Sequence, residues 1–195
     1  MIKVKDYKYS ISSSESSGDI IEIKSLNEQD LVFYTDWCKS HFNSGYIESL
    51  SAGEIERVIQ RDIKIHFVYI IRNNTVPCGE IIFWNDKSLT FEYNLFEKPV
   101  YNIWFKYYEN VDDITKIESL ELFLELSRTI DPKMKTMYTL ISQDAEEDKP
   151  VYEKCGFIKV DPSAYKSKME KFMKAKDMEN VYRTSGMYVL DMKGA

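Results

Sequence analysis

The strongest constraint on the fold is a hydrophobic period that changes three times along the chain. Apolar residues recur at helical spacing over 31–42 and 52–63, and then at strand spacing over 66–108. A helical period returns over 114–127 and a strand period over 137–142. Amphipathic elements of both kinds must bury their apolar sides against one another. The pattern therefore predicts an α/β (α+β) domain.

The predicted elements follow one another without a linker or an internal repeat. The serine-rich segment 12–17 is expected to be a loop, so the chain divides into a lead-in, 1–18, and one domain, 19–195. Helices are expected at 31–42, 52–63, 114–127, 150–155 and 163–180. Strands are expected at 19–24, 66–71, 79–84, 89–96, 100–108, 137–142, 157–160 and 187–192.

Composition excludes several function classes. The 195 residues are 44% hydrophobic and 14% aromatic, as expected of a folded chain with one core. A net charge of −6 argues against nucleic acid and anionic membranes as partners, and it suits a cationic substrate such as an amine. No apolar run approaches 18 residues, and the N-terminus lacks the apolar stretch of a signal peptide.

The cysteines and histidines indicate a reducing compartment and no metal. Cys38, Cys78 and Cys155 are widely spaced and form no C-x-x-C pair, which is typical of free thiols in the cytoplasm. The two histidines, His41 and His66, are too few for a His/Cys metal cluster and argue against a histidine triad. We therefore expect a cytoplasmic protein without a metal.

The stretch VYEKCGF, residues 151–157, raises the question of chemistry. Asp148 can act as N-cap, Pro150 suits the first turn, and Gly156 suits the left-handed position after a short helix. Tyr152 then lies on a short helix between two strands. Its ring either packs in the core, with its hydroxyl hydrogen-bonded, or takes part in catalysis.

The order of elements, with Tyr-Glu-Lys-x-Gly-Phe after the sixth strand, resembles the GNAT N-acetyltransferase superfamily over residues 19–193. The resemblance implies a mixed, mostly antiparallel sheet of six to seven strands with helices on both faces. Two parallel neighbours, 101–108 and 137–142, would splay apart, with acetyl-CoA in the opening. It also implies direct transfer of the acetyl group to a small-molecule or peptide amine, so none of the cysteines needs to be a nucleophile.

The same resemblance implies roles for individual residues. Tyr152 would be the general acid that protonates the leaving thiolate, and a backbone N–H of the first splayed strand would polarise the thioester. Glu92 and Glu109 could act as general base through a water, although Glu80, Glu92 and Glu109 also suit surface carboxylates. The expected cofactor contacts are Phe105, Lys106, Tyr107, Thr115, Lys116 and Ser142.

One departure from the family pattern leaves two other interpretations open. The family carries Arg/Gln-x-x-Gly-x-Gly/Ala before the long helix, but residues 110–117 read NVDDITKI and contain no glycine. Asp112 and Asp113 would repel a phosphate, and they suit an N-cap pair. The chain could therefore be a degenerate GNAT-fold domain that acts as a binding module. It could also be an unrelated α/β domain, which the strand order would reveal.

The predicted helix over 163–180 lengthens the connection between the last two strands. In the family this connection lies near the acceptor side. The helix would then cover the acceptor pocket or form the contact of a homodimer. Its lysines are diluted by acidic residues, which is typical of a solvated face.

Overall fold

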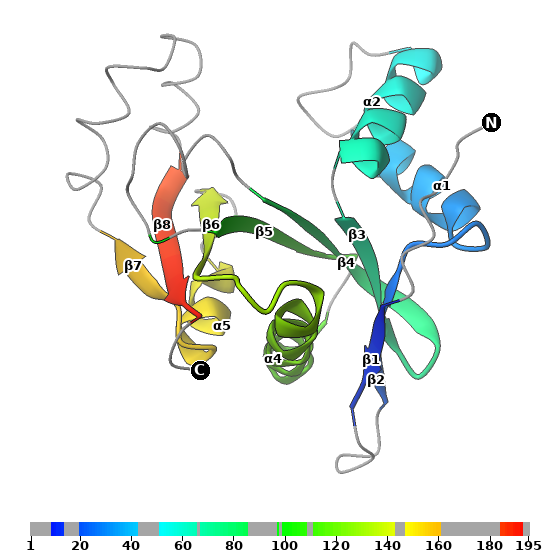
Figure 1. Ribbon diagram of the computed structural model, residues 1–195. Coiled ribbons are helices and arrows are strands. Elements are labelled where there is room, and N and C mark those ends of the chain that lie inside the picture. Colours follow the sequence, from blue (N-terminus) through cyan, green and yellow to red (C-terminus); the bar gives the residue numbers. More distant parts are fainter. Residues whose placement is uncertain are drawn as a thin grey trace, which may run out of the picture.

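The computed structural model describes residues 9–13, 20–42, 51–65, 67–85, 97, 99–108, 111–142, 147–160 and 184–192. Their strands form one sheet in the order β1-β2-β3-β4-β5-β6-β8-β7 (Figure 1). The strands are β1 Ser10–Ser12, β2 Ile21–Ser25, β3 Phe67–Asn73, β4 Val76–Asn85, β5 Val100–Tyr107, β6 Thr136–Ser142, β7 Ile158–Val160 and β8 Thr184–Asp191. The expected elements at 89–96 and 163–180 lie outside the described residues.

The sheet is mixed and mostly antiparallel, as predicted. Its parallel pair is β5–β6, which are neighbours over three residue pairs, from Val100↔Thr136 to Asn102↔Tyr138. Beyond Asn102 and Tyr138 both strands continue without pairing to each other, so they splay apart. The prediction of a splayed parallel pair is confirmed.

The number of strands differs from the prediction of six to seven, because the described sheet has eight. The unexpected strand is β1, within the segment expected to be a lead-in. Ser13 accepts a hydrogen bond from the Ile21 N–H at 3.0 Å, and Ser25 donates to the Tyr9 carbonyl at 2.9 Å. Serine side chains therefore reinforce a strand that has no alternating apolar pattern to reveal it.

Helices cover both faces of the sheet (Figure 1). They are α1 Leu31–Phe42, α2 Ala52–Ile65, α4 Asp113–Ile130 and α5 Lys149–Lys154. Val68 and Ile70 of β3 pack with α1 and α2, whereas Tyr69 and Ile71 belong to the cluster under α4 and α5. Side chains alternate between the faces of a strand, so β3 divides two cores. No helix in the described ranges has the length and apolar character needed to cross a membrane.

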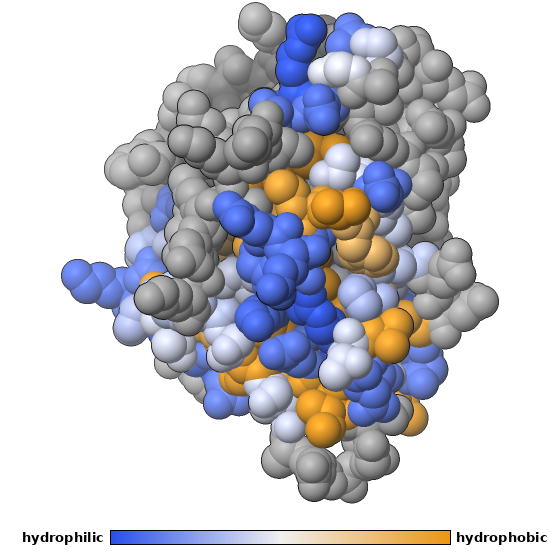
Figure 2. Space-filling model, turned by 90° about the vertical axis from the view of Figure 1, so that its right-hand side faces the viewer, coloured by the Kyte–Doolittle hydropathy of each residue, from blue (hydrophilic) through white to orange (hydrophobic). Residues whose placement is uncertain are grey.

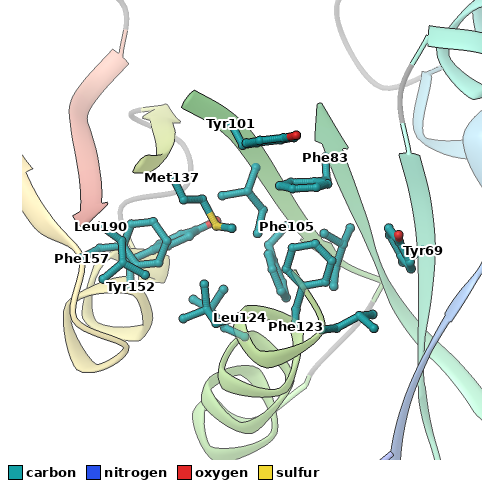
Figure 3. Packing of buried hydrophobic residues seen from close by; sticks show 14 of the residues in the cluster. Tyr69, Phe83, Tyr101, Phe105, Phe123, Leu124, Met137, Tyr152, Phe157 and Leu190 are labelled. Carbon is teal, nitrogen blue, oxygen red and sulfur yellow. The ribbon is translucent and has the colours of Figure 1, made fainter. Parts of the chain in front are cut away.

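Phe123 anchors α4 to the sheet. Its ring meets Tyr69, Phe83 and Phe105 edge-on, with centroids 5.5, 5.4 and 6.1 Å away (Figure 3). Edge-to-face contacts of this kind add about 0.5–1.5 kcal/mol to the area that each ring buries. One side chain thus joins β3, β4 and β5 to the helix that precedes β6.

The edge of the sheet at β1 is hydrophilic. Figure 2 faces this side of the molecule, and it shows a hydrophilic band down the middle with hydrophobic patches directly above and below it. A short edge strand within a polar surface gives another chain little to pair with. A different irregularity of the sheet, the place where β5 and β6 separate, is the one that could admit a ligand.

Gly79 allows β5 to approach β4 closely beside a β-bulge at Cys78, and this generates a prediction. A Cβ at this position would lie 2.8 Å from the Lys106 carbonyl oxygen. We expect Gly79→Ala to lower the free energy of unfolding by about 1–3 kcal/mol in urea titrations. Gly53→Ala is the control, because a Cβ there meets nothing within 4 Å and alanine favours a helix. Equal effects of the two substitutions would contradict this account.

Candidate active site

The opening between β5 and β6 is bridged by one side chain from α5. The Tyr152 hydroxyl is hydrogen-bonded to the Thr139 side chain of β6, and the backbone N–H of Phe105 in β5 lies close enough to it to lower its pKa. Both partners lie just beyond the last β5–β6 pair, Asn102↔Tyr138. The Tyr152 side chain is buried, with 5% of the residue exposed. The Phe105 N–H therefore faces the opening and not β4.

The local sequence explains why Tyr152 lies there. Gly156 has a φ of +87°, and its N–H donates to the Glu153 carbonyl at 3.1 Å. The Phe157 N–H donates to the Tyr152 carbonyl at 3.0 Å, which completes a Schellman motif. The Phe157 ring then packs edge-on against the Tyr152 ring at 5.4 Å. The predicted helix end at Gly156 is confirmed, and it fixes the tyrosine against the sheet.

The Asp148 side chain does not have the capping role that the sequence predicts. Asp148 occupies the N-cap position of α5, but its side chain makes no capping hydrogen bond. Its carboxylate accepts a hydrogen bond from the Lys116 ammonium at 2.9 Å. The predicted N-cap position is confirmed, but the side-chain capping bond is not made, because a cation from α4, 32 residues away in sequence, engages this carboxylate.

The environment of Tyr152 keeps its phenol protonated. Burial raises the pKa of Tyr152 well above the ordinary value near 10. The hydrogen bonds from Thr139 and from the Phe105 N–H oppose this shift, whereas the negative charge of Asp148 adds to it. Tyr152 therefore holds its proton at neutral pH, as a general acid must.

A small pocket of about 10 Å³, partly open to solvent and with room for about one water molecule, lies between β5, α4 and α5, with Tyr152 in its lining. Tyr107 lines the same pocket, and burial raises the pKa of its phenol well above the ordinary value near 10. The lining residues are Phe105, Tyr107, Leu120, Asp148, Val151 and Tyr152. Phe105, Tyr107 and Tyr152, which the sequence places in the site, are thus brought together.

The remaining predicted residues are more dispersed. The Lys106 ammonium lies 4.7 Å from the centre of the Trp37 ring of α1, on the other face of the sheet. Thr115 donates its backbone N–H to the Asp112 carboxylate at 2.7 Å, and the Thr115 side chain bonds to the same group. Ser142 ends β6. Glu92 and Glu109 lie outside the described residues.

Lys116 and Asp112 show how the start of α4 is stabilised. The Asp112 carboxylate caps α4, as the sequence predicts, and its pKa is lowered by the hydrogen bonds from Thr115. Lys116 is paired with Asp148, and its backbone carbonyl accepts from the Tyr107 hydroxyl at 3.0 Å. The charges at this helix end are therefore partly engaged within the protein.

Glu80 is not the surface carboxylate that the sequence suggests. It is only 3% exposed, and its negative charge raises the pKa of Tyr34 and Tyr108 beyond the effect of their burial. Glu80 belongs to β4, where the alternation of apolar residues predicts that one face is exposed to solvent. Instead α1 covers that face, so the strand is buried on both sides. Sequence reasoning also missed Thr139, which has no distinguishing signal within TMYTLIS.

No protein-family model and no curated protein matches the sequence. Solved structures do match. An uncharacterized protein from Bacillus halodurans aligns with a TM-score of 0.69 at 11% identity, covering 95% of this chain and 92% of that chain. The aminoglycoside acetyltransferase AAC(6')-Ib with coenzyme A and kanamycin gives 0.60 at 15% identity, with 88% and 94% covered.

A third match is the ribosomal L7/L12 alpha-N-protein acetyltransferase RimL in complex with coenzyme A. It gives a TM-score of 0.60 at 13% identity, covering 90% of this chain and 96% of that chain. These likenesses show that the chain has the GNAT fold. The interpretation as an unrelated α/β domain is therefore wrong.

The buried phenols give the stability a predictable dependence on alkaline pH. The folded-state pKa of Tyr152 is raised above an unfolded value near 10, so its contribution is full below pH 10 and is lost as the pH rises further. Each such tyrosine lowers the free energy of unfolding by about 1.4 kcal/mol per pH unit there. In urea titrations from pH 8 to 11, Tyr152→Phe should show a shallower decline than the wild type. Parallel declines would show that Tyr152 is not protected from ionisation.

Proposed function

We propose that this protein is an N-acetyltransferase that transfers an acetyl group from acetyl-CoA directly to a primary amine. The observation that carries the proposal is the protonated Tyr152 hydroxyl, held beside the Phe105 N–H in the opening between β5 and β6. A proton donor and a backbone N–H converge there on one point between the two strands. That pair of groups suits acyl transfer from a thioester.

The pocket fits the two ends of acetyl-CoA unequally. The aromatic and aliphatic side chains that line it, among them Phe105 and Val151, suit the pantetheine arm. The phosphate end lacks the family's glycine-rich loop, and the first turn of α4 carries the carboxylates of Asp112 and Asp113. The residues present therefore suit the acyl arm in their chemistry, but the pocket has room for about one water molecule and must widen to admit the arm. Phosphate binding would depend on side chains.

When bound, acetyl-CoA supplies the thioester whose acyl carbon the amine attacks. The Phe105 N–H would donate to the carbonyl oxygen and stabilise the negative charge that develops on it. Tyr152 would donate its proton to the leaving sulfur, as the C–S bond breaks and the N–C bond forms. The amine must first lose a proton, against a pKa of roughly 10. Glu92 and Glu109 stay as the predicted bases for that proton.

The closeness of the Tyr152 hydroxyl to the Phe105 N–H has a consequence for this mechanism. A carbonyl oxygen that accepts from the Phe105 N–H would have to displace the Tyr152 hydroxyl from beside it. Thr139, which is 2% exposed, remains as the second partner of that hydroxyl. Tyr152 would then stay at the opening, with its proton available to the sulfur.

The acceptor is proposed as a small-molecule or peptide amine in the cytoplasm. The net charge of −6 favours a cationic acceptor. Among the structures of similar fold, one enzyme is named for aminoglycosides and another for the N-terminus of a ribosomal protein. A homodimer also stays a prediction.

The second candidate is a GNAT-fold binding module without catalysis. It is favoured by the Asp112 carboxylate, which occupies the α4 N-terminus where the family binds the CoA pyrophosphate. This candidate requires that acetyl transfer be absent while the fold is intact. One set of measurements separates the two candidates.

The test combines ligand binding with activity. Acetyl-CoA at 100 times its dissociation constant should stabilise the protein by about 2.7 kcal/mol, which is visible as a higher melting temperature. With an amine panel, Tyr152→Phe should lower kcat about 100-fold and leave the thermal shift in place, because a general acid contributes about that factor. Tyr101→Phe is the matched control, since the Tyr101 hydroxyl donates to Asp131, at the end of α4 away from the opening.

Each other outcome has a definite meaning. A thermal shift without acetyl transfer to any amine would favour the binding module. No thermal shift at millimolar acetyl-CoA would contradict the proposed function. An equal loss of kcat in Tyr101→Phe and Tyr152→Phe would contradict the assignment of the acid.

A further inference from the structure

An ion pair links the two helices that flank the pocket. Lys116 of α4 and Asp148, which precedes α5, lie 2.9 Å apart, with side chains 14% and 27% exposed. Asp148 itself lines the pocket, as does Leu120, one turn further along α4 from Lys116. The pair therefore lies at the rim of the pocket, between the helix that leads into β6 and the helix that carries Tyr152.

Lys116 is positioned from the sheet as well as from α5. The Tyr107 hydroxyl donates to its backbone carbonyl at 3.0 Å, and its ammonium lies 5.5 Å from the centre of the Tyr107 ring. Asp148 raises the pKa of both Tyr107 and Tyr152 through its charge. The carboxylate is thus electrostatically close to the aromatic floor of the pocket as well as to Lys116.

We propose that Lys116 binds a phosphate group of acetyl-CoA and that Asp148 is its resting counter-ion, which the phosphate displaces. The inference rests on the proposed function, and it names the side chain that acts in place of the missing glycine loop. The ion pair spans the rim of the pocket before the ligand binds. On binding, the ammonium exchanges one anionic partner for another, and no covalent bond changes.

The exchange follows from charge. A phosphate offers more negative charge and more acceptor oxygens than a carboxylate, so it competes well for an ammonium. Asp148 competes for Lys116 and also repels the incoming phosphate, because like charges at short range disfavour each other. Loss of Asp148 should therefore strengthen CoA binding, and loss of Lys116 should weaken it. A merely structural ion pair predicts effects of the same sign.

The experiment measures dissociation constants by calorimetry for two probes, CoA and pantetheine, the second of which lacks phosphates. Asp148→Asn should bind CoA about tenfold more tightly than the wild type, and Lys116→Gln about tenfold more weakly, the factor expected for one charge-assisted hydrogen bond. Both variants should bind pantetheine within about twofold of the wild type. Melting temperatures without ligand establish that the variants fold.

Asp113→Asn is the matched control. Asp113 is an exposed carboxylate in the first turn of α4, so this variant removes the same charge from the same region without touching the ion pair. Its gain in CoA affinity should be clearly smaller than that of Asp148→Asn. When Lys116→Gln is already present, adding Asp148→Asn should raise the CoA affinity no more than adding Asp113→Asn does. Without the Lys116 ammonium, Asp148 and the phosphate no longer compete for a shared partner.

The outcomes separate this inference from the proposed function. If the wild type binds CoA but Asp148→Asn gains no more than Asp113→Asn, the exchange is overturned and the proposed function stands. If only Asp148→Asn binds CoA, the ion pair is a closed gate and the inference holds. If neither binds CoA, both are overturned. Should Asp148→Asn fail to fold, equal affinity of Lys116→Gln and the wild type for CoA would still overturn it.

Discussion

The whole site depends on where β5 and β6 stop pairing. The strands are held together at their start, because the N–H groups of Lys135 and Thr136 both donate to the Pro99 carbonyl. Three residue pairs later they separate, and the backbone N–H of Phe105 is left without a strand partner on that side. A buried N–H must find an acceptor. The Tyr152 hydroxyl lies beside this N–H, so the separation of the strands and the position of the tyrosine belong together.

A hydroxyl is a suitable group for this position because its bond to a backbone N–H can be exchanged for another. The same N–H can receive a carbonyl oxygen, and the phenol retains Thr139 when it lets go. Burial keeps the phenol protonated, so the group that lies at the opening at rest is also the one that would act as the acid in the proposed acetyl transfer. The cost is that the opening is narrow before a ligand enters. This is consistent with a pocket of only about 10 Å³, which has room for about one water molecule.

The local part of this arrangement could be predicted from the sequence, and the long-range part could not. Gly156 and Phe157 predict the end of a short helix, and the alternation of apolar residues in β3 and β4 predicts strands. Both predictions succeed because each pattern depends only on residues that are close in sequence. The pairing of Lys116 with Asp148 spans 32 residues and overrides the local preference of Asp148 for capping. Glu80 was misplaced for a related reason, since its burial depends on α1 lying over β4.

The β1 strand was missed because its support comes from serine hydroxyls and backbone groups, not from an apolar alternation. Conversely, the sequence shows directly that no glycine precedes α4, but it does not show which side chains lie at the start of that helix instead. The structure shows Asp112 engaged as a cap and Lys116 held near the pocket. Whether a chain without the glycine loop can recognise a phosphate thus depends on side chains whose partners only the fold reveals.

The most direct test of the central claim is the NMR signal of the Phe105 amide. The chain has ten phenylalanines, so ¹⁵N-phenylalanine labelling gives a sparse spectrum in which Phe105→Leu identifies the cross-peak. We predict that saturating acetyl-CoA shifts this cross-peak more than CoA does, because only acetyl-CoA carries the thioester carbonyl oxygen that would accept from this N–H. A Phe105 cross-peak that saturating acetyl-CoA leaves unmoved would contradict the placement of the acyl group between β5 and β6.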